Sequence, residues 1–288
     1  MAQTATTGNL ENAQRIILAA ARYTEEHNAP AMALIEQFTL PKGAKQVTVP
    51  KVGQMSMSDL QDGIDIVDEE EIGMTTVDLT AAEVGAKVIL TDKLVRQAAD
   101  NVMSIVGRQL GDGMARKKDN DVTALYSGFG TDLGTAGYTM KLGNISAAVA
   151  YAHGQKFGSQ VYINHHPFTV WDVANTAVTA SSTYPVPAGW TEDLLGNFFS
   201  GLRPINGVPI FEDGNISIDS SDDAIGVIAD KSALAVLKSV ETRTERQRDA
   251  SLRATELVMT SDYGVFELDD SKGAAMTLDA STPAFTSG

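Results

Sequence analysis

The four histidines are the residues of this sequence best suited to acid–base or metal chemistry, because imidazole titrates near neutral pH and binds transition metals. His165 and His166 are adjacent and follow a predicted strand, where ligands are often held, whereas His27 and His153 stand alone. Adjacent side chains on an extended chain point apart, and neither a His-Glu-x-x-His motif nor a second His/carboxylate motif supports the pair. We therefore expect His165 and His166 to occupy a hydrogen-bonded strand end.

Other catalytic signatures are missing from the sequence. The stretch Gly128-Phe129-Gly130-Thr131-Asp132-Leu133-Gly134 resembles a dinucleotide-binding fingerprint, but it has one residue too many and follows no clear strand, so a flexible loop is predicted. The sequence contains no Gly-x-Ser-x-Gly elbow and no phosphate-binding P-loop. We therefore predict no catalytic residue, no cofactor and no metal site. An enzyme of unknown class that depends on His165 or His166 is the alternative from a different functional class.

One segment has an unusual charge pattern, because it contains many acidic residues and no lysine or arginine. A run of like charge is usually a solvated loop, but it also suits a surface that docks on a basic patch of another chain. A metal site in the run 68–71 is disfavoured, because consecutive strand positions face opposite ways and no calcium-loop spacing is present. The acidic residues between Val52 and Ala86 are Asp59, Asp62, Asp65, Asp68, Glu69, Glu70, Glu71, Asp78 and Glu83.

Composition indicates an ordinary folded protein. Hydrophobic residues make up 43% of the 288 residues and charged residues 20%, and no cysteine is present to form disulfides or thiolate metal sites. The net charge of −15 argues against a phosphate-binding surface, so the chain should repel nearby DNA. The apolar run 16–21 is too short to span a bilayer and no signal peptide is visible, so we expect a protein that is neither exported nor held in a membrane.

The first ninety residues contain segments that need a partner surface. Helical patterns over 11–27 and 32–38 predict an arm that is too thin to be a domain. Strand patterns over 47–49, 74–79 and 85–90 predict a long hairpin and a further strand with too little apolar bulk for a core of their own. A two-stranded hairpin alone is marginal in water. This part of the chain should therefore lie on another surface.

A long helix follows the hairpin. Thr91 is the predicted N-cap, and apolar residues recur at helical spacing over 92–119. Asp92 at the start and the basic run 116–118 at the end would complement the helix dipole. A helix of this length spans about 40 Å. A single long helix beside a hairpin describes an extended molecule.

The remaining sequence alternates between helical and strand patterns, which predicts the α+β class. The Asn206-Gly207 pair lies between β-forming residues and signals a hairpin, and after Asp269 the chain becomes small and polar. The predicted helices are 146–155, 167–176, 191–199 and 231–239, and the predicted strands are 160–164, 224–229, 240–248, 256–260 and 265–268.

Four short stretches in this order resemble the major capsid proteins of tailed bacteriophages. They are Val47-Thr48-Val49-Pro50, Val77-Asp78-Leu79-Thr80, Leu90-Thr91-Asp92-Lys93-Leu94 and Ile205-Asn206-Gly207-Val208-Pro209-Ile210. Together with the order of elements, they cover nearly the whole chain and are similar to the Hong Kong 97-like fold, which encapsulin shells share.

The resemblance implies an α+β fold with four named parts. The N-terminal arm would be residues 1–40, and the extended β-hairpin loop would be residues 41–90. A peripheral domain containing the long spine helix would combine 91–142 with 239–288, and an axial domain would be 143–238. In this family the arm and the hairpin reach over neighbouring subunits.

The resemblance also implies a structural function and not an enzymatic one. Copies of the chain would form pentamers and hexamers of an icosahedral shell that encloses double-stranded DNA without sequence-specific binding. Partners would include separate scaffolding, portal and decoration proteins, and the protein would occur in the virion and, during assembly, in the host cytoplasm. The alternative is an encapsulin-type bacterial compartment. The acidic run Glu69, Glu70 and Glu71 is expected to meet basic residues of a neighbour, for which the candidates are Arg108, Arg116, Lys117 and Lys118.

Two features differ from some members of the family. The arm helix is predicted to start about ten residues from Met1, so any scaffold is expected to be a separate protein or unnecessary. The hairpin has no lysine between Lys51 and Lys87, so covalent crosslinking through a hairpin lysine is not expected.

Overall fold

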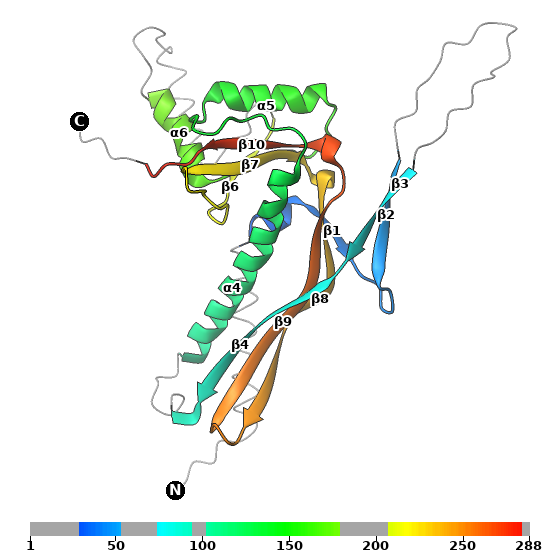
Figure 1. Cartoon of the computed structure of the whole chain (residues 1–288), viewed down its shortest axis with the longest axis vertical. Helices are drawn as coiled ribbons and strands as arrows, with labels where there is room; N and C mark the ends of the chain where they lie inside the picture. The colour runs from blue at the N-terminus through cyan, green and yellow to red at the C-terminus, as the bar shows by residue number, and fades with distance from the viewer. Residues whose placement is uncertain (1–28, 53–73, 94–101, 179–206, 284–288) are drawn as a thin grey trace, which may run out of the picture.

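A computed structural model describes residues 29–52, 74–93, 102–178 and 207–283. These residues form two four-stranded sheets, a separate two-stranded ribbon and a long helix (Figure 1). The helices are α2 (Ala31–Leu34), α4 (Val102–Ala124), α5 (Leu142–Gly154) and α6 (Pro167–Val178), and the 3-10 turns are η1 (Leu125–Gly128), η2 (Lys231–Ala233) and η3 (Asp270–Lys272). The strands are β1 (Glu36–Thr39), β2 (Gln46–Val52), β3 (Met74–Thr80), β4 (Ala82–Thr91), β5 (Val161–His165), β6 (Ile210–Glu212), β7 (Asp223–Asp230), β8 (Leu234–Asp249), β9 (Ala254–Glu267) and β10 (Gly273–Asp279).

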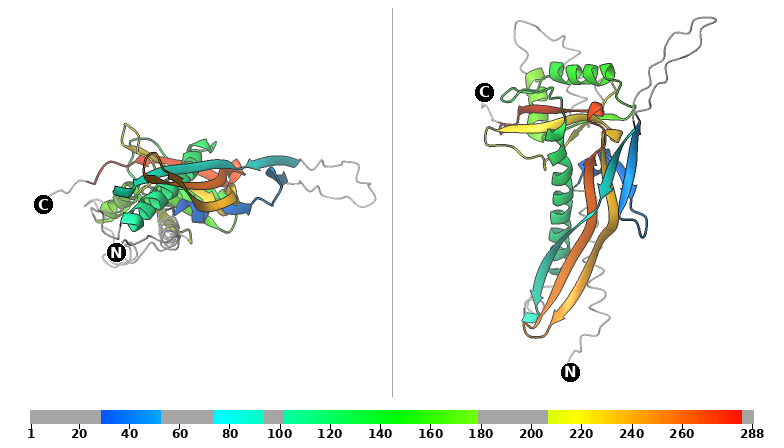
Figure 2. Two further views of the ribbon diagram at one scale, coloured as in Figure 1. Left: turned by 90° about the horizontal axis from the view of Figure 1, so that it is seen from below. Right: turned by 45° about the vertical axis from the view of Figure 1, so that its right-hand side comes forward.

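The first sheet has the strand order β1-β8-β9-β4 and extends away from the rest of the molecule beside α4 (Figures 1 and 2). β9 pairs antiparallel with β8 and with β4, whereas β1 pairs parallel with β8. Alternate residues of β9 are buried, and Met259 packs with Leu110 and Met114 of α4. This alternation is typical of a sheet with one covered face.

The second sheet has the order β10-β7-β5-β6 and lies across the other end of the molecule, with α5 and α6 beside it (Figure 1). Its core combines Ile163 and Ile228 of the sheet with Val149 of α5 and Val170 of α6. A larger core cluster joins the two sheets and includes Tyr126, Phe129, Val227 and Val236.

Most predicted elements are confirmed within the described residues. The helices at 146–155 and 167–176 correspond to α5 and α6. The strands predicted at 47–49, 74–79, 85–90, 224–229 and 240–248 lie within β2, β3, β4, β7 and β8, and the strand predicted at 160–164 corresponds to β5, which begins one residue later. The strands predicted at 256–260 and 265–268 are one strand, β9. The helices predicted at 11–27 and 191–199, and Asn206 of the predicted hairpin, lie outside the described residues.

Two predicted helices are wrong in whole or in part. Residues 231–239 form η2 and the start of β8, because the four residues from Leu234 to Leu237 are fully buried in a strand that pairs on both sides. Continuous burial suits a central strand better than a helix with one covered face. The helix predicted at 32–38 ends at Leu34, because residues 36–39 pair with β8 instead.

The long helix ends later than predicted, at Ala124 instead of residue 119. The basic run 116–118 therefore does not lie in the last turn, where it would complement the helix dipole. Thr91 is the last residue of β4, and residues 94–101 of the predicted helix lie outside the described residues. None of the described helices has the length and apolar character needed to cross a membrane.

Two segments that looked featureless in sequence are ordered by contacts. The segment after Asp269 contains β10, whose Ala274 and Met276 are buried and which pairs with β7. The glycine-rich stretch 128–134 is not a flexible loop, because Gly130 N–H donates to Asp270 Oδ1 at 2.7 Å and Phe129 is buried. At Gly134 an added Cβ would lie 2.2 Å from the backbone oxygen of Thr277, so glycine permits this close approach.

Two strands cross the predicted domain boundaries. β4, which the sequence placed in the hairpin segment 41–90, pairs with β9 in the first sheet. β10, which the sequence placed in the peripheral segment 239–288, pairs with β7 in the second sheet.

Candidate assembly surfaces

The β2–β3 ribbon has almost no core of its own. Its strands pair antiparallel with Val49 opposite Val77, and Leu79 is its only fully buried side chain over residues 46–51 and 75–80. The ribbon meets the body where β3 lies against β9 and through an ion pair between Lys51 Nζ and Asp269 Oδ1 at 2.6 Å. Such a ribbon gains stability by burying its remaining surface on something else.

The segment joining the two ribbon strands, residues 53–73, lies outside the described residues and contains the predicted contact residues Glu69, Glu70 and Glu71. By sequence this segment holds seven acidic residues and no lysine or arginine: Asp59, Asp62, Asp65, Asp68, Glu69, Glu70 and Glu71. Its charge therefore makes a basic surface its natural partner.

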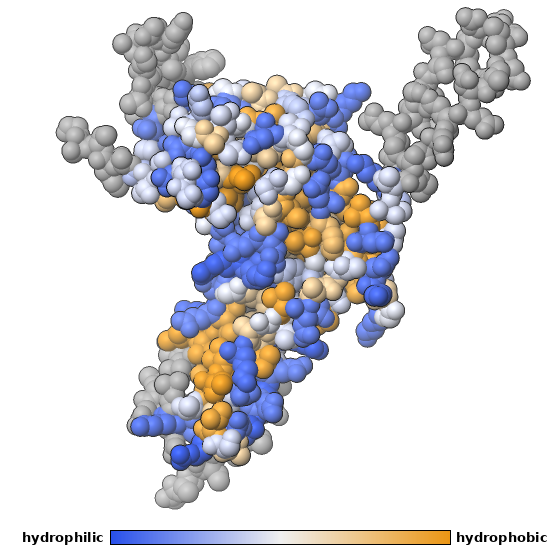
Figure 3. All heavy atoms as spheres, viewed as in Figure 1, coloured by the Kyte–Doolittle hydropathy of each residue, from blue (hydrophilic) through white to orange (hydrophobic). Residues whose placement is uncertain are grey.

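Three of the four predicted basic contact residues are exposed on α4, and a hydrophilic band crosses this face of the molecule over the helix (Figure 3). Arg116 Nη2 lies 2.6 Å from Asp112 Oδ2, and Lys117 Nζ lies 2.5 Å from Asp121 Oδ1. Exposed ion pairs of this i,i+4 kind contribute only about 0.3–0.5 kcal/mol. Arg116 and Lys117, together with Arg108, can therefore exchange these contacts for partners on another chain at little cost.

Lys118 has a different environment, because it is buried within the chain. Its Nζ donates to Thr242 Oγ1 at 3.2 Å and lies 5.4 Å from the ring centroid of Tyr263. The Tyr263 hydroxyl in turn donates to Asp121 Oδ2 at 2.7 Å. These contacts tie α4 to β8 and β9, so Lys118 holds the spine helix on the first sheet.

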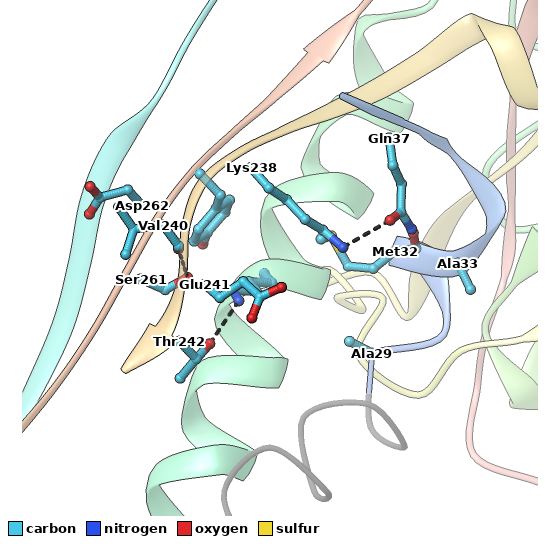
Figure 4. A pocket seen from close by; sticks show the side chains of 12 residues that line it. Ala29, Met32, Ala33, Gln37, Lys238, Val240, Glu241, Thr242, Ser261 and Asp262 are labelled. Carbon is cyan, nitrogen blue, oxygen red and sulfur yellow. Dashed lines mark hydrogen bonds between the residues drawn. The ribbon is translucent and has the colours of Figure 1, made fainter. Parts of the chain in front are cut away.

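A pocket of about 310 Å³ lies where the segment after Ala29 passes over α4, β8 and β9 (Figure 4). Lys238 crosses it and donates to Gln37 Oε1 at 2.9 Å, which links β8 to β1. The pocket therefore lies at a joint between elements. The residues lining it are Ala29, Met32, Ala33, Gln37, Lys118, Lys238, Val240, Glu241, Thr242, Ser261, Asp262 and Tyr263.

Exposed apolar side chains occur on the elements at the far end of the first sheet. Ile89 of β4 is 46% exposed, Ile105 of α4 is 47% exposed, and Leu252 in the β8–β9 turn is 56% exposed. Figure 3 shows apolar surface gathered near this end. Apolar surface of this kind commonly marks a protein–protein contact.

The prediction for the histidine pair is confirmed at His165. His165 Nδ1 accepts the backbone N–H of His166 at 2.9 Å, so Nε2 carries the proton and donates to Met276 O at 3.0 Å. Burial lowers the pKa of His165 to about 4, and the ring is therefore neutral at pH 7. Because both ring nitrogens are occupied, this side chain has no lone pair to offer a metal. The part of the chain that the structure describes contains no group of three metal-binding side chains.

Asp119 of α4 is among the buried charged residues that sequence reasoning missed. It is fully buried and accepts hydrogen bonds from Ala31 N–H at 3.0 Å and from Asn215 Nδ2 at 2.9 Å. Burial and the neighbouring Asp213 raise its pKa to about 7. The signal was present in the sequence, because Asp119 falls on the helix stripe that also carries the buried Ala115 and Val122.

Known structures with the same arrangement of elements are capsids. The chain matches the head structure of Helicobacter pylori bacteriophage KHP40 with a TM-score of 0.68 and 12% identity, covering 86% of this chain and 88% of that one. It matches the capsid of Ralstonia phage GP4 with a TM-score of 0.67 and 14% identity, covering 88% and 89%. A Mycobacterium phage Che8 structure matches with a TM-score of 0.65 and 17% identity, covering 81% and 84%.

The chain has the fold of a tailed-phage major capsid protein. This confirms the α+β class and the fold that the sequence resembled. No protein-family model matches the sequence, and no curated protein matches it either. At 12–17% identity the relationship is visible in the arrangement of elements and not in the residues.

Proposed function

We propose that this chain is a major capsid protein whose copies assemble into an icosahedral shell around double-stranded DNA. The observation that carries the proposal is a match to phage capsid structures over more than four-fifths of both chains. The described elements suit the same role, because a ribbon without a core and exposed apolar residues gain stability in an assembly. The proposed partners are pentamers and hexamers of the chain itself, with separate scaffolding, portal and decoration proteins.

The proposed parts follow the strand pairing. The N-terminal arm comprises residues 1–40, and the ribbon with its acidic segment forms the extended loop. The peripheral domain is the first sheet with α4, which includes β4. The axial domain is the second sheet with α5 and α6, which includes β10.

The charge of the chain supports a container for DNA instead of a DNA-binding protein. A net charge of −15 repels the phosphate backbone, so packed DNA would remain free to move against the shell. The protein would then occur in the virion and, before completion of the shell, in the host cytoplasm.

The proposed contact between subunits joins the acidic segment to α4 of a neighbour. Glu69, Glu70 and Glu71 would meet Arg108, Arg116 and Lys117, whose side chains are exposed. Lys118 is left out of the contact because its ammonium group is buried against Thr242 and Tyr263.

Electron microscopy of the purified chain, combined with light scattering, tests the proposal. Closed, uniform, angular shells are the expected result, and nuclease-protected DNA inside shells made with the neighbouring phage genes would separate a phage capsid from an encapsulin-type compartment. Shells filled with a cargo protein would favour the compartment. A chain that stays unassembled with those genes co-expressed contradicts both.

A further inference from the structure

Two buried carboxyl groups meet where three segments of the chain join. Asp119 lies on α4 and Asp213 follows β6, and the two residues are 0% and 1% exposed. The backbone N–H of Ala31 brings in the third segment by donating to Asp119 Oδ1 at 3.0 Å. Asn215 Nδ2 donates to Asp119 Oδ2 at 2.9 Å, so both oxygens of Asp119 already have a donor. The junction therefore connects the base of the N-terminal segment, the spine helix and the β6–β7 loop.

Asp213 has one oxygen that no described donor reaches. Its Oδ1 accepts the backbone N–H of Asn215 at 2.9 Å, whereas its Oδ2 is buried without a hydrogen-bond partner among the described residues. The carboxyl of Asp119 is close by, because Asn215 donates to both groups, through Nδ2 to Asp119 and through its backbone N–H to Asp213. A buried carboxylate oxygen without a donor is costly, so a proton between the two groups is the simplest way to satisfy it.

We propose that Asp119 and Asp213 share one proton, and that this proton locks the base of the N-terminal segment and the β6–β7 loop onto α4. Two ionised carboxylates side by side repel, whereas a carboxyl and a carboxylate form a strong charge-assisted hydrogen bond. Removing the proton converts attraction into repulsion within a site that has little water. The lock is a property of the single chain and does not depend on shell formation.

His166, between β5 and α6, and Tyr126 of η1 do not neutralise the pair. Burial, followed by the neighbouring Asp213, raises the pKa of Asp119 to about 7. Burial also lowers the pKa of His166, although the charge of Asp213 opposes this shift, so the ring is neutral at pH 7. Burial raises the pKa of Tyr126 well above its ordinary value, so its hydroxyl is neutral too.

The nearby cations are engaged elsewhere. Arg116 shares the open pocket beside Asp213, but its guanidinium is 2.6 Å from the exposed Asp112. Lys118, next to Asp119 in sequence, points to Thr242 and Tyr263. A proton shared between the two carboxyl groups therefore takes the place of a neutralising cation.

The sign of the pH dependence follows from the raised pKa. Between about pH 4 and pH 7 the unfolded chain has released this proton while the folded chain keeps it, so the contribution of the pair to stability falls as the pH rises. Above about pH 7 both states are ionised and the contribution levels off. His165 titrates in an overlapping range with the opposite sign, and the charge of Asp213 acts on His166 as well, so the infrared measurement below separates the pair from the two histidines.

The test is the unfolding midpoint of unassembled wild type and Asp213→Asn from pH 5 to pH 8. The amide nitrogen of the variant takes the place of Oδ2 and donates to Asp119 without a shared proton. The unfolding midpoint of the variant should therefore rise steadily relative to that of the wild type as the pH rises. Glu83→Gln, at an exposed position of β4, should show a constant difference. Parallel curves for Asp213→Asn and wild type would overturn the proposal.

An infrared measurement on the wild-type chain decides the question even if Asp213→Asn fails to fold. The carbonyl band of a buried protonated carboxyl should persist at pH 6 and lose half its intensity near pH 7, above the pKa of about 6 to which burial raises Asp172. Absence of that band at pH 6 would show that the two groups do not hold a proton. Because neither measurement involves shells, its failure is separate from failure of the proposed function.

Discussion

Lys117 and Lys118 are neighbours on α4 with opposite surroundings, which makes them a matched pair for mutation. Lys118→Ala removes a hydrogen bond to Thr242, a cation–ring contact with Tyr263 and buried volume. We expect it to lower the free energy of unfolding by about 2–4 kcal/mol. Lys117→Ala breaks only an exposed ion pair with Asp121 and should change the free energy of unfolding by about 0.5 kcal/mol or less. Urea unfolding of both variants measures the difference.

The outcome also decides what Lys118 does. If Lys118 were a contact between subunits, as the sequence suggested, Lys118→Ala would leave the unfolding of the single chain unchanged and would weaken only assembly. Loss of stability in the unassembled chain assigns Lys118 to the joint between the helix and the first sheet.

His165 should make the chain sensitive to acid. Its pKa is about 4 in the folded chain, against about 6.5 for an unperturbed histidine, so the unfolded chain binds a proton first as the pH falls. Stability that is present above pH 6.5 is therefore lost as the pH falls towards 4, by up to about 3 kcal/mol. Thermal unfolding of His165→Gln should show a weaker fall over this range, whereas His153→Gln, at an exposed position of α5, should follow the wild type. An unchanged acid slope in His165→Gln contradicts the assignment.

At the scale of elements, the joint between the ribbon and the first sheet depends on a close approach at Gly264. A Cβ added there would lie 2.2 Å from the backbone oxygen of Thr80. Gly264→Ala should therefore push β3 away from β9, lower the free energy of unfolding by about 1–3 kcal/mol and speed protease cleavage of the ribbon. Gly113→Ala, in α4 with open space around it, should instead stabilise the chain by about 0.5–1 kcal/mol. A ribbon that resists protease equally in both variants would contradict the role of Gly264.

Sequence patterns predicted the elements whose periodicity agrees with their surroundings. β2 and β3 were found from their alternating β-branched residues, β5 from a short run of β-forming residues, and α5 from its helical spacing. The start of β8 was missed because Ala, Leu and Lys favour a helix locally, while pairing with both β1 and β9 favours a strand. β10 was missed because its small residues carry little strand signal and its burial comes from distant parts of the chain.

The candidate surfaces were predictable to the extent that they depend on charge. The acidic segment and the basic residues of α4 are visible in the sequence, whereas the direction in which each side chain points is not. Lys118 and Asp119 show the limit, because both belong to a charged run yet both are buried. Only the packing of α4 against β8, β9 and the N-terminal base explains their positions.

At the scale of the whole molecule, the long sheet and helix extend away from the second sheet, and the ribbon lies beside them (Figure 2). Such a shape has a large surface relative to its volume, and a single chain cannot bury this surface within itself. Burial of exposed apolar residues such as Ile105 and Leu252 against other copies would compensate for this. The charged segments would then select the register in which copies meet.

A charge exchange tests that selection in the proposed shell. Changing Glu69, Glu70 and Glu71 to lysine replaces three of the seven acidic charges of the segment 53–73 by three positive ones, which takes its charge from −7 to −1. We expect this triple variant to fold and to fail in assembly, as should Arg108→Glu/Arg116→Glu/Lys117→Glu, because each leaves like charges opposite one another. The two sets combined should restore shells, as measured by light scattering and electron microscopy.

A matched control separates a local contact from overall charge. Lys141→Glu/Lys156→Glu/Lys231→Glu alters the net charge by the same amount as the α4 set, at exposed positions on other elements. If it blocks assembly as strongly, general repulsion between subunits and not the proposed contact is responsible. If the combined variant fails to assemble although both single sets fold, the acidic segment does not meet α4.

Salt should weaken the wild-type contact, because charges on an exposed surface are screened beyond about 10 Å at 0.1 M. If assembly of the wild type is insensitive to salt, the apolar residues at the end of the first sheet, and not the charges, determine how the copies align.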